Sequence, residues 1–171
     1  MKSSILVRWG FIGICCAVAI SCSRKNDLPQ PIAFSHRQHI AKKIHCTFCH
    51  SGAEKYLAAT IPSVTVCMSC HSVVKTDSPE IRKVKHYLQT HEEIPWHRIY
   101  QLPSEADVFF NHHRHSAAGV KCVKCHGDVG SRDVLVQEVK LVMGFCIQCH
   151  REHRAQFRPV GMADDCSTCH R

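Results

Sequence analysis

The sequence contains few of the residues that normally build a hydrophobic core. Only 34 of the 150 residues from Cys22 onward are Leu, Ile, Val or Phe, about 23%, which would support a thin core for a chain of that length. The 13 cysteines and 15 histidines exclude a disordered tail, a collagen-like chain and a cytosolic enzyme. We therefore expect something other than side chains to fill the interior.

The sequence also lacks an apolar run long enough for an ordinary membrane-spanning helix. Its first apolar run, residues 9–20, is shorter than the roughly 20 residues that a bilayer requires. The run ends in AISC at 19–22, which looks like a bacterial lipoprotein cleavage box. We predict that residues 1–21 are an export leader and that Cys22 is lipidated; an uncleaved membrane anchor and a plainly cleaved signal remain alternatives. Each alternative places the mature chain outside the cytoplasm, on the periplasmic side of the inner membrane.

What the sequence does have is a five-fold repeat of the pattern C-x-x-C-H. Two cysteines three positions apart lie on one face of a helical turn, so their thiols can add to the two vinyl groups of one haem. The histidine that follows lies on the same face and can bind the iron. We therefore predict five covalently bound haem c groups, attached through Cys46, Cys49 and His50; Cys67, Cys70 and His71; Cys122, Cys125 and His126; Cys146, Cys149 and His150; and Cys166, Cys169 and His170.

Disulfides and zinc are the other uses of C-x-x-C pairs. Zinc sites give no reason for histidine to follow every second cysteine, and disulfide scaffolds do not require the five-residue pattern to repeat. Haem attachment takes place outside the cytoplasm, where the leader would send this chain. These points favour haem over both alternatives.

The positive charge of the chain does not predict nucleic-acid binding. The formal net charge is +8, and removal of residues 1–21 leaves 20 basic and 14 acidic residues, or +6. Two propionates on each haem would bring this close to neutrality or below it. The chain also has no run of Lys or Arg with interleaved aromatic residues, so we expect no nucleic-acid partner.

A second repeat lies upstream of two of the haem motifs. The pattern F-x-H-x-x-H at 34–39 precedes Cys46 at the same offset as the pattern at 110–115 precedes Cys122. A low-spin haem needs a sixth, distal iron ligand, and each pattern offers two histidines for the two haems that follow it. We predict these distal ligands to be His36, His39, His112 and His115, with His36 and His112 serving the next haem along the chain and His39 and His115 a neighbouring one.

The fifth haem motif has no such pattern, so its distal ligand must come from elsewhere in the chain. We expect His97, with His153, His91 and Met143 as the alternatives. For His45, His86 and His113 we expect ordinary surface or core positions.

These motifs predict a mostly coil chain with short α-helices, built of two di-haem modules and a C-terminal fifth haem. The segments are a leader at 1–21, module 1 at 32–75, a linker at 76–107, module 2 at 108–152 and the fifth haem segment at 153–171. Ser78 as a cap and Pro79 at the first helical position predict one helix in the linker, over 79–92. In residues 134–142, valines alternate imperfectly with polar residues, which predicts a short strand or the start of a helix.

The F-x-H-x-x-H pattern before C-x-x-C-H resembles that of the small class III multihaem cytochromes, in which it supplies distal ligands to two haems. A closer likeness lies in PWHRIYQLP at 95–103, VFFNH at 108–112, GVKC at 119–122 and MGFCIQCHR at 143–151. These stretches are similar to the pentahaem cytochrome c subunit of alternative complex III, a bacterial quinol-oxidising assembly. The resemblance implies electron transfer between iron–sulfur and quinol-binding membrane subunits and a soluble or membrane-bound electron acceptor.

The sequence therefore predicts a membrane-tethered pentahaem electron carrier that is part of a quinol:acceptor oxidoreductase complex, rather than an enzyme by itself. Two other functions remain open. One is a free-standing periplasmic electron shuttle. The other is a small multihaem reductase in which one haem keeps an open distal position.

Overall fold

The chain was studied as a computed structural model, which describes residues 29–157 and 162–170. Within these residues the chain is mostly coil with short helices, and its only strand-like pairing is an isolated bridge between Val108 and His170. This confirms the expected mostly coil chain with short α-helices. The predicted leader and the lipidation site at Cys22 lie outside the described residues. No helix in the described part of the chain is both long and apolar enough to cross a bilayer.

Most of the helices are one or two turns long and begin at or beside a haem motif or a distal histidine. The longest, α4, is the exception, because it belongs to the linker. The α-helices are α1 (His36–Ile40), α2 (Cys46–Cys49), α3 (Val64–His71), α4 (Pro79–Thr90), α5 (His112–Ala117), α6 (Val123–His126) and α7 (Met143–Glu152). Short 3-10 helices lie at η2 (Ser51–Glu54), η3 (Ser104–Ala106), η4 (Val129–Ser131), η5 (Arg154–Gln156) and η6 (Cys166–Thr168).

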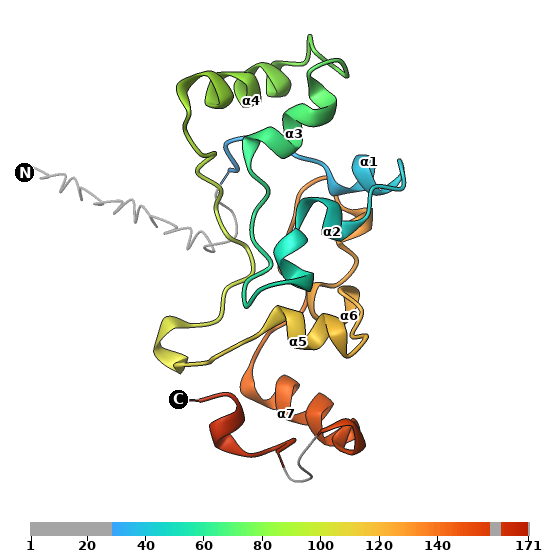
Figure 1. The fold of residues 1–171 in the computed structure, drawn as a ribbon, viewed down its shortest axis with the longest axis vertical. Helices are drawn as coiled ribbons and strands as arrows, with labels where there is room; N and C mark the ends of the chain where they lie inside the picture. The colour runs from blue at the N-terminus through green and yellow to red at the C-terminus, as the bar shows by residue number, and fades with distance from the viewer. Residues whose placement is uncertain (1–28, 158–161, 171) are drawn as a thin grey trace, which may run out of the picture.

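The helices are distributed along the longest axis of the molecule, in an order that differs from their order in the chain (Figure 1). Helices α3 and α4 lie at the upper end of this view, α1 and α2 lie near the middle with α5 and α6 below them, and α7 and the C-terminal segment lie at the lower end. The haem motifs are therefore spread along the whole length of the molecule.

The hydrophobic core is as thin as the composition predicts. Among the residues that the structure describes, its one cluster of buried side chains consists of Ile32, Val64, Val84 and Ile94, against which Trp96 and other partly buried side chains pack. The cluster joins α3 to α4 and to the segments that flank them. Burial of apolar surface therefore holds α4 against a helix that carries a haem motif.

Helix α4 confirms the predicted linker helix and is shorter than expected by two residues. It begins at Pro79 and ends at Thr90, because His91 adopts a left-handed conformation with φ of 57°. The backbone N–H of His91 bonds to the carbonyl oxygen of Leu88, 3.4 Å away, which closes the last turn.

Residues 134–142, where we expected a strand or the start of a helix, are coil. The backbone N–H groups of Glu138 and Val139 are instead directed to the phenol oxygen of Tyr100, at 2.9 and 3.5 Å. A side chain thus takes the place of a partner strand, so no regular pairing forms.

Candidate haem sites

The five C-x-x-C-H motifs are called sites 1 to 5 in chain order. In four of them, the histidine donates its Nδ1 proton to a backbone carbonyl oxygen: His50 to Thr60 at 2.8 Å, His71 to Val74 at 2.9 Å, His150 to Ala163 at 3.0 Å and His170 to Ala106 at 3.0 Å. A carbonyl oxygen can only accept, so Nδ1 carries the proton and the lone pair is left on Nε2. This bond also fixes the direction of the ring. Each histidine is therefore prepared to bind iron through Nε2.

The two F-x-H-x-x-H patterns fold in the same way. Helix α1 is capped by Ser35, whose side chain accepts from Gln38 N–H, and α5 is capped by Asn111, whose side chain accepts from Arg114 N–H, both at 3.1 Å. These caps place the two histidines of each pattern on one helix, three residues apart. The sequence repeat is thus also a structural repeat.

A phenylalanine orients both histidines of each pattern. In the first, the ring of Phe34 stacks on His39 with centres 4.5 Å apart and meets His36 edge-on at 4.8 Å. In the second, Phe110 stacks on His115 at 4.6 Å and meets His112 edge-on at 4.7 Å. The apolar residue of the pattern therefore sets the angle between the two imidazoles.

In three of the four predicted distal histidines, Nδ1 also bonds to a backbone carbonyl oxygen. His39 bonds to Ser35 and His115 to Asn111, both at 2.8 Å and both to the carbonyl four residues earlier. His112 bonds instead to the carbonyl of Leu57, 3.1 Å away in module 1. These bonds again leave Nε2 for a metal.

Three of the four predicted distal histidines lie across a gap from the histidine of a haem motif. The ring centres are 6.1 Å apart for His39 and His71, 6.4 Å for His112 and His126, and 6.1 Å for His115 and His150. An imidazole nitrogen lies about 2 Å from a bound first-row metal, so two imidazoles on opposite sides of one iron have ring centres about 6 Å apart. The observed gaps therefore fit a single iron atom.

The fourth predicted distal histidine, His36, interacts electrostatically with His50. Burial, with smaller contributions from the neighbouring His50 and His39, lowers the pKa of His36 to about 4. Burial also lowers the pKa of His126, with smaller contributions from His112 and His50. Both histidines are thus held neutral, which is the form that binds a metal.

The ten cysteines of the motifs are present as thiols without disulfides. Burial raises the pKa of Cys49, Cys67, Cys122, Cys125 and Cys146, and a thiol of a neighbouring site raises it further in each case. The thiols of different sites therefore lie near one another.

Large apolar side chains beside the thiols are exposed. The exposed fraction is 55% for Phe48, 58% for Val123 and 66% for Met143, each within or next to a motif. Exposed apolar surface at this density normally marks a binding site, and a haem edge is the group that these thiols and imidazoles fit. The residues present are therefore suited to haem on three grounds: paired thiols, facing imidazoles and uncovered apolar surface.

The fifth site is held against the segment that leads into α5. Asp165 caps η6 by accepting from Ser167 N–H, and the backbone N–H of Phe109 donates to the carbonyl of Cys169 at 2.7 Å. With the bridge between Val108 and His170, these bonds fix the end of the chain beside module 2.

The structure separates the four candidates for the fifth distal ligand. His91 ends α4, at the opposite end of the molecule from the fifth site (Figure 1). His97 is exposed and lies beside module 1, where its backbone bonds to the side chain of Gln30 at 2.8 and 3.1 Å. Met143 begins α7 and His153 directly follows it, with Nδ1 of His153 2.9 Å from the carbonyl of Cys149.

The carbonyl groups that orient the histidines were not found by sequence analysis. Thr60, Leu57, Ala106 and Ala163 act through the backbone, which carries no sequence signal. Tyr100 donates its hydroxyl to the carbonyl of His126 at 2.8 Å. It belongs to the stretch 95–103 that carries the family resemblance, and this was the one signal that could have identified it.

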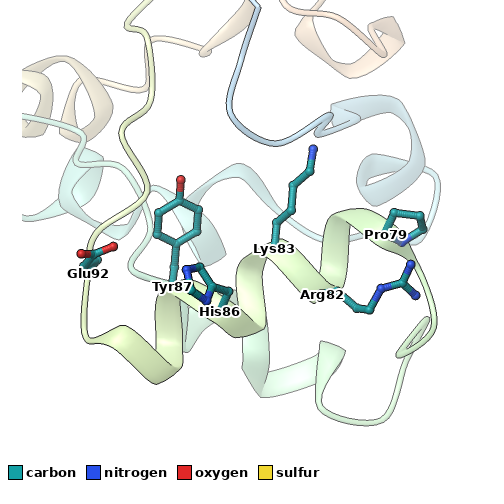
Figure 2. A pocket seen from close by; sticks show the side chains of 6 residues that line it. All are labelled: Pro79, Arg82, Lys83, His86, Tyr87 and Glu92. Carbon is teal, nitrogen blue, oxygen red and sulfur yellow. The ribbon is translucent and has the colours of Figure 1, made fainter.

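Helix α4 also has a shallow depression that is separate from the haem motifs. Figure 2 shows its lining, with Lys83 and Tyr87 extending from the same side of the helix and Arg82 directed toward Pro79. A second cavity, of about 260 Å³, lies between α3 and α4 and is lined by residues that include His71 and Lys85. The first contains no residue of a haem motif, whereas the second touches site 2.

Comparison with known proteins agrees with this geometry. Residues 108–171 match a family described as cytochrome c7 and related cytochrome c. The chain is 32% identical over 164 residues to the menaquinone reductase, multihaem cytochrome c subunit, of Nitratidesulfovibrio vulgaris (strain Hildenborough), and the match covers 83% of this chain and 77% of that protein. With its paired thiols and facing imidazoles, the chain belongs to the multihaem cytochromes c of quinone-linked oxidoreductases.

Proposed function

We propose that the chain is a pentahaem cytochrome c that transfers electrons on the periplasmic side of the inner membrane, as a subunit of a membrane quinol:acceptor oxidoreductase complex. The observation that carries this proposal is the set of three imidazole pairs with centres 6.1 to 6.4 Å apart, each next to a pair of thiols. An iron held between two histidines has no open position for a substrate. This arrangement suits an electron carrier.

When bound, haem supplies a one-electron couple at each site. The chain itself has three tasks. The cysteines would fix each haem in place, the Nδ1 bonds hold the imidazoles that form them in the tautomer that binds through Nε2, and the phenylalanine of each pattern fixes the angle of the distal rings. The potential of each site then depends on these ligands and on how far water is excluded.

The proposed assignment of ligands follows from the facing pairs. His36 and His50 serve site 1, and His39 and His71 serve site 2. In module 2, His112 and His126 serve site 3, and His115 and His150 serve site 4. What supports these pairs is ring separation for three of them and electrostatic proximity for the pair at site 1.

For site 5 we propose His153 in place of His97 as the distal partner of His170. Nδ1 of His153 bonds to the carbonyl four residues earlier, which is the geometry that His39 and His115 show. The residues on either side of His153 are also held near the fifth motif, because Arg151 and Arg154 both contact Asp164, two residues before Cys166, at 3.3 and 3.1 Å.

The proposed partners are iron–sulfur and quinol-binding membrane subunits on one side and a soluble or membrane-bound electron acceptor on the other. The relative in N. vulgaris is by name a subunit of a menaquinone reductase, which supports a quinone-linked complex. Anchoring through a lipid on Cys22 would keep this chain beside such partners.

Two measurements on the full chain test this proposal. Intact-mass spectrometry of the purified mature chain should find the mass of five haem groups and a lipidated N-terminal cysteine. Affinity purification from detergent-solubilised membranes should recover iron–sulfur and polytopic partners. Five haems with no membrane partner would reject the proposed complex and leave a free-standing electron shuttle. A colourless chain would reject both functions.

A further inference from the structure

We infer that the five sites form a single file in the spatial order 2–1–3–4–5, so that sites 2 and 5, and not sites 1 and 5, are its two ends. This inference rests on the proposed function, since it requires a haem at every site. The order of the motifs in the sequence would instead suggest that the first site is an end.

Sites 1 and 2 are neighbours because they share α1. His36 and His39 lie three residues apart on this one short helix, and one interacts with His50 while the other faces His71. The thiols of Cys49 and Cys70 interact across the two sites.

Sites 3 and 4 are neighbours for the same reason. His112 and His115 lie on α5 and face His126 and His150. The thiol of Cys125 interacts with those of site 4. Each module therefore contributes one adjacent pair.

The two modules meet through sites 1 and 3. Helix α5 rests on η2, which directly follows site 1: His112 N–H donates to the carbonyl of Leu57 at 3.0 Å, and the hydroxyl of Ser116 donates to the carbonyl of Ala53 at 2.9 Å. The thiol of Cys46 also contributes to the raised pKa of Cys122. Site 1 is thus inside the file, between sites 2 and 3.

Site 5 continues the file beyond site 4. The ring of His150 is fixed by the carbonyl of Ala163, three residues before Cys166. The thiol of Cys146 interacts with that of Cys169. Figure 1 shows the same sequence of elements along the long axis, from α3 through α2 and α6 to α7 and the C-terminal segment.

Site 2 is thereby placed at the end that α4 covers. The core cluster packs α4 against α3, and the chain leaves site 2 through Val73, whose side chain is 81% exposed only two residues after His71. The two ends of the file are therefore the α3–α4 end of the molecule and the C-terminal segment.

The direct test is to locate the five irons in the haem-loaded full chain by anomalous X-ray scattering at the iron edge, with each iron assigned to its motif. We expect the iron of site 2 to have one iron neighbour, that of site 1, and the iron of site 1 to have two. An iron of site 2 that lies between those of sites 1 and 3 would overturn the order. Fewer than five irons would instead count against the proposed function, so the two failures are distinguishable.

A solution experiment tests the same order by removing one haem at a time. In the double variant Cys67→Ala, Cys70→Ala, the ferric EPR signal of site 1 should change while those of sites 3, 4 and 5 stay as they are. In the matched variant Cys46→Ala, Cys49→Ala, the signals of both sites 2 and 3 should change. A changed site 3 signal in the first variant would contradict the order, and the iron positions decide it if either variant fails to fold.

Discussion

The imidazole rings of His112 and His126 have centres 6.4 Å apart and planes only 9° from parallel. His112 comes from the F-x-H-x-x-H pattern of module 2 and His126 from the haem motif that follows it. The gap between the rings is the width that one iron atom requires. This pair is the clearest case in which hydrogen bonds and packing, those of His112 with the carbonyl of Leu57 and the ring of Phe110, position a proposed ligand opposite the histidine of a haem motif.

Removal of one distal histidine should open one iron. In His39→Ala, site 2 loses its distal ligand, and we expect a ferric high-spin EPR signal equal to one of the five irons. His86→Ala is the matched control, because His86 lies on the exposed face of α4 and should leave the spectrum unchanged. A fully low-spin spectrum in His39→Ala would show that His39 does not bind iron.

The distal ligand of site 5 can be identified by comparing two variants. His153→Ala should add a high-spin signal of one iron in five, whereas His97→Ala should not, because His97 lies beside module 1. Optical spectra of both ferric variants measure the high-spin fraction of the haem iron. The opposite result would restore His97 as the ligand and reject the argument from the geometry of His153.

Loss of the Tyr100 hydroxyl should destabilise module 2. In Tyr100→Phe, the carbonyl of His126 and the N–H of Glu138 lose their partner, which should lower the free energy of unfolding by about 1 to 2 kcal/mol. Urea denaturation followed by circular dichroism gives this value. Tyr56→Phe, at a side chain that is 62% exposed, should change it by less than about 0.5 kcal/mol.

Truncation of a side chain in the small core should lower the stability of the protein measurably. Val84 is 4% exposed, and Val84→Ala should lower the free energy of unfolding by about 2 kcal/mol, because it opens a cavity between α3 and α4. Val73→Ala, at a side chain that is 81% exposed, is the control and should have almost no effect. Equal effects in thermal or urea unfolding would mean that the cluster does not stabilise α4.

The sequence was most informative where a short motif builds its own geometry. The cap and the phenylalanine of each F-x-H-x-x-H pattern are local, so Phe34 and Phe110 orient their histidines within a few residues. The linker helix was predictable for the same reason, from Ser78 and Pro79. Its end was missed by two residues because the left-handed conformation of His91 has no glycine to mark it.

The parts that were not predictable depend on contacts between distant residues. Residues 134–142 are coil because Tyr100, 38 residues before Glu138, bonds to their backbone. The carbonyls of Leu57 and Ala106 orient His112 and His170 across 55 and 64 residues of sequence. The spatial order of the sites likewise depends on α5 resting on η2, which no local pattern reveals.

The most direct test of the whole account is the integrated ferric EPR spectrum of the purified mature chain. The account predicts five low-spin irons per chain, each held between two imidazoles. A chain without haem iron would contradict it outright, and a high-spin signal of one iron in five would show that one site keeps an open position, as a reductase requires.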